Sequence, residues 1–180
     1  NGKITCVISS KEDAYALERA KNNGIKTIVL KRKDYPDVAS YSKAMAETLK
    51  AENADLVVYA GFMTILDEQV CNAFPYKMIN VHPALIPSFC GKGFYGLHVH
   101  EAALAKGVKL SGATVHFVTE ECDGGPIILQ KAVEVKNGDT PETLQKRIME
   151  EAEWKILPYA VKLFCDDKIE IRDGKAVVSE

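Results

Sequence analysis

Three polar residues, Asn80, His82 and Asp123, have the types and spacing of a site that handles charge and protons. Asn80 and His82 lie at the end of an apolar run and alternate with Val81, so in a strand their side chains point to one face. Pro83 follows directly and favours an extended backbone at His82. An amide and an imidazole on one face can together hold an oxygen atom that gains negative charge, which is often a large catalytic contribution.

Asp123 begins the sequence Asp-Gly-Gly-Pro, which is typical of a sharp and well-defined turn. A carboxylate placed beside an imidazole favours the charged ring, so Asp123 is the candidate partner of His82. The residues alone leave a second interpretation open. In that interpretation Asn80 and Asp123 are turn residues, and His82 packs locally.

The remaining histidines carry weaker signals. His98-x-His100 could form a metal pair, but no third ligand follows at motif spacing, so the sequence predicts no metal site. His116 lies inside the apolar run Ala-Thr-Val-His-Phe-Val, which predicts a hydrogen-bonded wall residue of a strand. Neither a nucleophile elbow nor a complete P-loop motif is present in the sequence.

Strands and helices alternate along the chain, which predicts an α/β fold with a sheet that is mostly parallel at first. The predicted strands are residues 4–9, 26–30, 55–60, 78–81, 112–119 and 127–135. The first predicted helix follows a capping box at Ser9-x-x-Glu12. Further helices are predicted at residues 40–53, 67–73, 101–106 and 140–166. In the last of them Thr140 is the N-cap, and Pro158 is expected to cause a kink. A hairpin is expected around Asp173-Gly174. Ligands in such sheets bind at the carboxyl ends of strands, where Gly61, Asn80 and Thr119 fall.

Length and composition fit one soluble domain over residues 1–180. The net charge is -2 and no basic run occurs, so we expect no nucleic-acid partner. No apolar stretch is long enough for a membrane span. Five cysteines, an odd number without C-x-x-C spacing, favour a reducing cytoplasmic location.

Several motifs together, in order and at similar spacing, resemble the folate-dependent phosphoribosylglycinamide formyltransferase family. They are Ala60–Met63, Ile79–Pro83, Leu85–Pro87, Gly112–Val118 and Asp123–Gln130. The resemblance implies a Rossmann-like formyltransferase fold, with a mostly parallel twisted sheet flanked by helices and a C-terminal β-hairpin. It also implies transfer of a formyl group from 10-formyltetrahydrofolate to the amine of glycinamide ribonucleotide in purine biosynthesis, without a metal.

The resemblance assigns a role to each matching position. Asn80 and His82 would stabilise the oxyanion, and Asp123 would keep His82 charged and help to move the amine proton. Gly61, Pro83 and Glu153 would contact the ribonucleotide. The residues that would bind the folate are Phe62, Met63, Thr64, Ile65, Leu66, Met78, Val118, Thr119, Glu120, Glu121 and Cys122.

The sequence departs from the family pattern at two places. The family begins with a strand and a Gly-rich turn that holds the substrate phosphate, and this chain starts at what resembles the second strand. Val38 stands where the family often has an arginine that reaches the folate tail. The loop Phe89–Gly96 is longer than in some members.

Two other functions stay open at this point. One is a formyltetrahydrofolate deformylase, in which water replaces the amine, and the other is an inactive, truncated folate-binding domain. The expected partners are small-molecule substrates only, with the chain a monomer or a homodimer.

Overall fold

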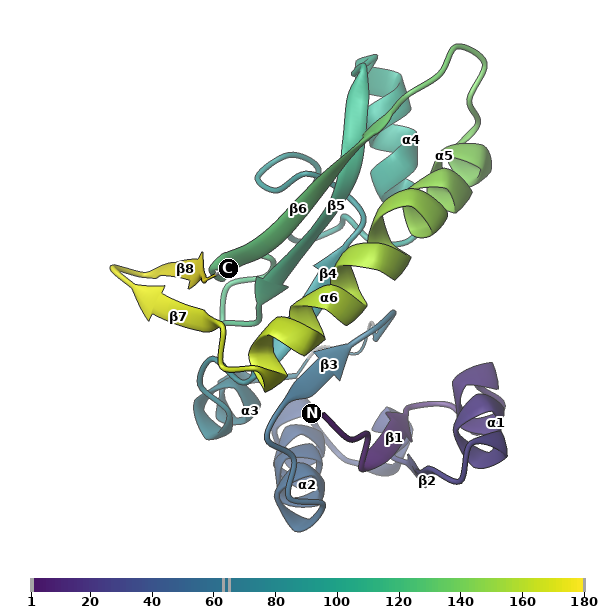
Figure 1. Cartoon of the computed structure of the whole chain (residues 1–180). Coiled ribbons are helices and arrows are strands. Elements are labelled where there is room, and N and C mark those ends of the chain that lie inside the picture. The colour runs from purple at the N-terminus through teal and green to yellow at the C-terminus, as the bar shows by residue number, and fades with distance from the viewer. Residues whose placement is uncertain (1, 63, 65, 180) are drawn as a thin grey trace. The chain divides into compact units, whose positions relative to one another are not determined.

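The computed structural model describes residues 2–62, 64 and 66–179 (Figure 1). The described residues form two compact units. One contains residues 58–60 and 79–179, and the other contains residues 2–57 and the described part of 61–78.

In the unit that contains residues 2–57, two strands pair in parallel, as expected. They are β1 (Cys6–Ser9) and β2 (Lys26–Val29), with Cys6 opposite Lys26. Helix α1 (Tyr15–Asn22) packs on both strands. The predicted capping box at Ser9 is wrong, because the Ser9 hydroxyl accepts a hydrogen bond from the Lys11 amide at 3.0 Å and so forms a local turn instead.

The other elements of this unit are η1 (Arg32–Asp34), α2 (Val38–Ala51) and α3 (Glu68–Ala73). Helix α2 begins two residues before the predicted start, because the Asp37 side chain caps it by accepting from the Ser40 amide at 2.7 Å. The buried side chains of α2 include Tyr41, Met45 and Leu49, at helical spacing. The Ser42 hydroxyl accepts from the Asp67 amide at 2.9 Å, which ties α2 to the start of α3.

The unit that contains residues 79–179 is built around a sheet whose described strands have the order β3-β4-β5-β6. Its strands are β3 (Val57–Tyr59), β4 (Met78–His82), β5 (Leu110–Phe117) and β6 (Ile127–Glu134), each within two residues of the predicted ends. The pairings β4–β5 and β5–β6 are antiparallel, so this sheet is not mostly parallel as predicted. Residues 111–117 of β5 are buried, so this strand forms the core of the unit.

The helices of this unit are α4 (Leu97–Lys106), α5 (Pro141–Ile148) and α6 (Trp154–Cys165), with the π-helical turn η2 (Met149–Glu153) between the last two. Helices α5 and α6 run along β5 and β6, and α4 packs beside α5 (Figure 1). Thr140 and Thr143 form the N-terminal capping box of α5, so the predicted N-cap is confirmed.

The long C-terminal helix departs from α-helical geometry at η2, and α6 continues through Pro158, where the kink stays a prediction. A proline ring crowds the carbonyl group four residues earlier, which is that of Trp154. The wide π-helical turn ends immediately before Trp154, so the helix changes its geometry ahead of the crowded position.

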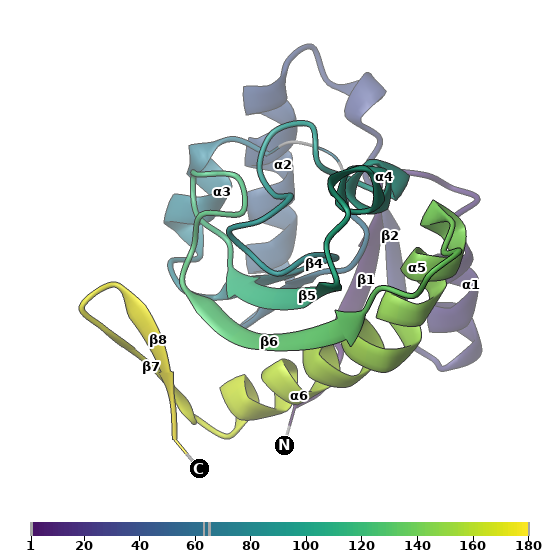
Figure 2. The same ribbon diagram turned by 90° about the horizontal axis from the view of Figure 1, so that it is seen from above.

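The expected C-terminal hairpin is confirmed. Strands β7 (Ile169–Arg172) and β8 (Lys175–Val178) pair antiparallel and extend from the end of α6 (Figure 2). Asp173 and Gly174 both have positive φ angles, of 49° and 72°, as a type I′ turn requires. Within the described residues, no helix has the length and apolar character needed to cross a membrane.

The loop between β5 and β6 is closed by a very close approach of two backbone segments. The Phe117 amide donates to the Pro126 carbonyl at 2.9 Å. A Cβ atom added at Gly125 would lie 1.9 Å from the Phe117 carbonyl oxygen, so only glycine fits there. This contact holds residues 118–126 as one loop, and that loop carries Asp123.

We predict that Gly125→Ala lowers the free energy of unfolding by about 1–3 kcal/mol, because the new methyl group must push β5 and β6 apart. Gly124→Ala is the matched control, since the nearest atoms to its Cβ would belong to the exposed Glu121 side chain, which can turn away, and not to the backbone. The control should stay within about 0.5 kcal/mol of the wild type in urea denaturation. Equal losses in both variants would contradict the close-approach argument.

Candidate active site

The pairing of β4 with β5 brings two polar side chains together. Asn80 lies opposite His116 in the antiparallel register, and its Nδ2 atom is 3.3 Å from His116 Nε2. His116 is 2 % exposed, and its Nδ1 atom donates to the Phe117 carbonyl at 2.8 Å. The prediction of a hydrogen-bonded wall residue is therefore confirmed, but His116 also borders the predicted site. The sequence contains no signal for this position, because it does not reveal the register of the strands.

Asp123 lies between two imidazole rings. Its Oδ1 atom is 3.5 Å from His116 Nε2, and its Oδ2 atom is 3.6 Å from His82 Nδ1. The Gly91 amide donates to Oδ2 at 2.9 Å. The backbone of Asp123 is left-handed, with a φ angle of 57°, a conformation that is uncommon outside glycine and often found at functional sites. The structure thus brings the three predicted residues Asn80, His82 and Asp123 together around His116.

The Asp123 carboxylate is held in its ionised form. Its side chain is only 10 % exposed, and this burial works to raise the pKa of the carboxyl group. The hydrogen bonds from His116 and the Gly91 amide, with the charge of His82, outweigh the burial and lower the pKa to about 2. Asp123 is therefore a permanent negative charge at neutral pH.

Both ring nitrogens of His82 face oxygen atoms. Nε2 lies 2.8 Å from the Phe89 carbonyl and must donate to it, because a carbonyl oxygen only accepts. Nδ1 faces Asp123, as described above. The ring is 4 % exposed, so these two contacts fix its orientation.

Thr114, opposite His82 in the strand register, fixes the chain that follows His82. Its hydroxyl donates to the Ala84 carbonyl at 2.7 Å and accepts from the Ile86 amide at 3.1 Å. Gln130, on β6, donates to the Ile86 carbonyl at 2.9 Å. Side chains from two neighbouring strands therefore hold the loop immediately beyond the candidate catalytic histidine.

His100, on α4, is buried, and neither of its ring nitrogens has a hydrogen-bond partner among the described residues. Burial, followed by the charge of His82, lowers the pKa of His100 from 6.5 to about 4. His100 is thus a neutral ring within electrostatic range of His82.

The predicted ligand residues of the unit that contains residues 79–179 fall in three places. Pro83 is half-buried and directly follows His82. Glu153 is half-buried at the end of η2, where burial raises the pKa of its carboxyl group. The others lie on the loop that leads from β5 to Asp123, namely Val118, Thr119, Glu120, Glu121 and Cys122.

The other predicted ligand residues belong to the unit that contains residues 2–57. Met78 is fully buried, which is consistent with a core side chain. Phe62, Thr64 and Leu66 are half-buried, and Gly61 has a φ angle of 67°. Met63 and Ile65 lie outside the described residues.

The remaining polar clusters of the described chain do not form a second site of this kind. No group of three or more His, Cys, Asp or Glu side chains in the described residues is placed to hold a metal ion. All five cysteines are free thiols. Cys122 borders the site, with its Sγ atom 3.8 Å from Asp123 Oδ2. Burial, followed by the charge of Asp123, raises the pKa of its thiol.

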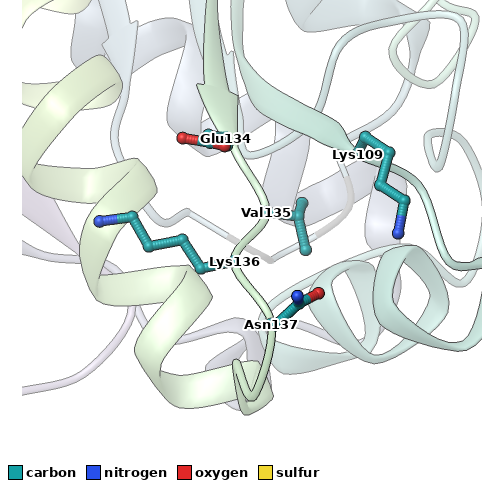
Figure 3. Close-up of a pocket in the computed structure, with 5 residues that line it drawn as sticks. All are labelled: Lys109, Glu134, Val135, Lys136 and Asn137. Atoms are coloured by element: carbon teal, nitrogen blue, oxygen red, sulfur yellow. The ribbon is translucent and has the colours of Figure 1, made fainter.

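A pocket of about 480 Å³ lies at the opposite end of the β5–β6 pair from His116, where Lys109 and Glu134 contribute to its lining. The Lys109 and Lys136 side chains point away from each other (Figure 3). They do not converge on one ligand, and we assign this pocket no part in the chemistry.

Comparison with known proteins identifies the family. Residues 1–161 match the family model described as formyl transferase. The chain therefore belongs to the formyl transferase family. A chloroplastic phosphoribosylglycinamide formyltransferase of Arabidopsis thaliana is 38% identical over 96% of this chain and 59% of its own length. The chain thus spans less than two thirds of that relative.

Solved structures give the same family. A glycinamide ribonucleotide transformylase 1 from Symbiobacterium toebii is 41% identical, with a TM-score of 0.93, covering 99% of this chain and 82% of its own. A formyltetrahydrofolate deformylase from Pseudomonas syringae is 31% identical, with a TM-score of 0.85, covering 98% of this chain and 56% of its own. The Rossmann-like formyltransferase fold implied by the sequence is confirmed.

The low pKa of Asp123 predicts a specific loss of stability in acid. A depressed carboxyl pKa stabilises the fold above the ordinary value of 3.8, and this stabilisation is lost as the pH falls through about 2. Between pH 5 and pH 2 the wild type should lose about 2 kcal/mol more of its unfolding free energy than Asp123→Asn. Urea denaturation at several pH values measures this. The exposed Asp55→Asn control should follow the wild type, and a pH dependence of Asp123→Asn equal to that of the wild type would contradict the prediction.

The buried neutral His100 predicts a second, separate pH window. Its stabilisation is complete above 6.5 and is lost as the pH falls to about 4, because the unfolded ring takes up a proton first. His100→Met should remove about 3 kcal/mol of this dependence between those pH values. His98→Gln, at an exposed position of the same helix, serves as the control. The same window seen in both variants would show that another group causes it.

Proposed function

We propose that this protein transfers a formyl group from 10-formyltetrahydrofolate to the amine of glycinamide ribonucleotide, as an enzyme of purine biosynthesis. One observation carries the proposal: the buried Asp123 carboxylate lies between His82 and His116, and His116 contacts Asn80. Membership of the formyl transferase family and the names of the relatives support it.

In the proposed reaction the amine nitrogen attacks the formyl carbon and a new C–N bond forms. The formyl oxygen becomes an oxyanion, and the side chains of Asn80 and His82 stabilise it by donating hydrogen bonds. In the structure His82 Nε2 donates to the Phe89 carbonyl. The substrate oxygen would take the place of that carbonyl.

The second half of the reaction breaks the bond between the formyl carbon and N10 of the folate, and N10 takes up a proton. The attacking amine loses one proton, so the reaction is balanced when a proton moves from the amine to N10. Asp123, with water, would accept and pass on this proton while its charge favours the cationic form of His82. No covalent intermediate on the enzyme and no metal are required.

The contacts to the two substrates follow from the family resemblance. Residues 62–66, Met78 and the loop 118–122 would hold the folate, and Gly61, Pro83 and Glu153 would hold the ribonucleotide. The half-buried Glu153 is suited to bind sugar hydroxyl groups, which can donate to its carboxyl oxygens.

The proposal treats residues 1–180 as one formyltransferase domain, since the family match covers parts of both units. It includes small-molecule partners only, and a monomeric or homodimeric chain. The five free thiols support a reducing compartment such as the cytoplasm.

Deformylation is the second candidate, favoured by the likeness to the Pseudomonas syringae structure. The two functions differ in the group that attacks the formyl carbon. We would incubate the chain with 10-formyltetrahydrofolate, with and without glycinamide ribonucleotide, and follow the release of tetrahydrofolate. Product that depends on the ribonucleotide supports the transferase, and equal product in both samples indicates the hydrolase. No product in either would contradict both and leave a folate-binding domain.

Conservative variants test the assigned roles. His82→Asn and Asp123→Asn should each lower kcat/KM by about 10²–10⁴-fold, because each removes a proton carrier or its charged partner. His98→Asn changes an exposed histidine outside the network and should keep the wild-type rate. Circular dichroism establishes that the variants are folded. A rate for His82→Asn within threefold of the wild type would remove this residue from the mechanism.

A further inference from the structure

A second pocket lies in the unit that contains β1 and β2. Because the two strands are parallel, their carboxyl ends meet at one edge, where the Leu30 amide donates to the Ser9 carbonyl at 2.9 Å. The segments that follow the strands contribute most of the lining of a pocket of about 480 Å³. Carboxyl ends of parallel strands are a usual place for ligands, and the volume suits a small organic molecule.

The lining of this pocket is strongly charged. Of the described residues, those that line it are Ser10, Lys11, Glu12, Asp13, Lys31, Arg32, Lys33 and Thr64. Four of them are cationic and two are carboxylates, so the lining carries a net charge of two positive units (4 − 2). The whole chain has a net charge of -2, so this local excess opposes the overall balance and attracts anions.

One cation of the pocket is already compensated. Lys31 Nζ lies 2.5 Å from Glu12 Oε1, with the Lys31 side chain 24% exposed. Among the lining residues, Lys11, Arg32 and Lys33 remain, with one further carboxylate, that of Asp13. Asp37, outside the lining, also interacts electrostatically with Arg32. The half-buried Arg32 uses Nη1 to donate to the Tyr35 carbonyl at 2.9 Å, and this bond orients its guanidinium group. Counted over the lining residues alone, two positive charges are left without a paired carboxylate.

We propose that this pocket binds a ligand with two or more anionic oxygen groups, through Lys11, Arg32 and Lys33. The backbone amide of Lys11 is occupied by the Ser9 hydroxyl, so the binding groups are side chains and not a backbone nest. Side-chain cations spread over two loops fit several separated charges better than a single compact ion.

Two ligands share this chemistry. One is the chain of γ-linked glutamates on a reduced folate, which carries one carboxylate per glutamate, and the other is a phosphate-bearing nucleotide. Thr64 borders the pocket and belongs to the segment assigned above to the folate, which favours the glutamate chain. Only this choice between the two ligands rests on the proposed function. The binding of a multivalent anion does not.

Calorimetric titration at low ionic strength tests the proposal with two probes, tri-γ-glutamate and inorganic pyrophosphate. The double variant Lys11→Gln/Lys33→Gln should weaken binding about tenfold or more, because it removes the two exposed cations of the pocket. The matched control Lys43→Gln/Lys50→Gln changes the net charge equally on α2 of the same unit and should alter affinity less than about twofold. Tighter binding of tri-γ-glutamate supports the folate chain, and tighter binding of pyrophosphate supports a phosphate ligand.

The variant Glu12→Gln tests the proposal through a gain of affinity, which loss of the fold would not produce. It removes one competing carboxylate and releases Lys31, so affinity for the bound probe should rise severalfold. Three outcomes would overturn the proposal: no binding of either probe by the wild type, equal losses in the two double variants, or an affinity of Glu12→Gln no higher than that of the wild type. None of these measurements requires formyl transfer, so the proposed function and the anion pocket can fail independently.

Discussion

The ionised carboxylate of Asp123, nearly removed from water, is the constraint on which the site depends. A buried charge is costly unless it is paired and hydrogen-bonded. Asp123 meets this condition with three partners from different parts of the chain, namely His82 on β4, His116 on β5 and the Gly91 amide in the loop before α4. Removal of any one of them leaves the carboxylate short of compensation, so these elements are coupled through a single charge.

The need to hold this carboxylate in place also explains several features of the backbone and the strand register around it. The left-handed backbone at Asp123 turns its carboxylate toward the sheet, and the close contact at Gly125 keeps the loop from opening. The register of β4 and β5 is equally important, because a shift by one residue would turn His116 to the opposite face. Thr114 and Gln130 reinforce this register by holding the loop that follows His82.

Local pattern was sufficient to predict the strands of the sheet and the shared face of Asn80 and His82, because the period of two residues is a local property. The turn at Asp123 could also be predicted, because two glycines follow this residue. The place of His116 between Asn80 and Asp123 was not, since it depends on pairing between strands distant in sequence. Backbone groups such as the Phe89 carbonyl carry no sequence signature. The predicted capping box at Ser9 failed because a serine can satisfy a nearby amide in a turn as well as at a helix start.

The contact between the Phe89 carbonyl and His82 has a consequence for affinity. The carbonyl is part of the same chain, so it acts as a tethered competitor at high effective concentration for any oxygen that seeks His82 Nε2. A ligand that replaces it exchanges one hydrogen bond for another, and the gain is only the difference between the two. A neutral carbonyl oxygen gains little from this exchange, whereas an oxygen that carries negative charge gains more. The site thereby favours an oxygen atom that gains negative charge during a reaction over a neutral oxygen atom that only binds.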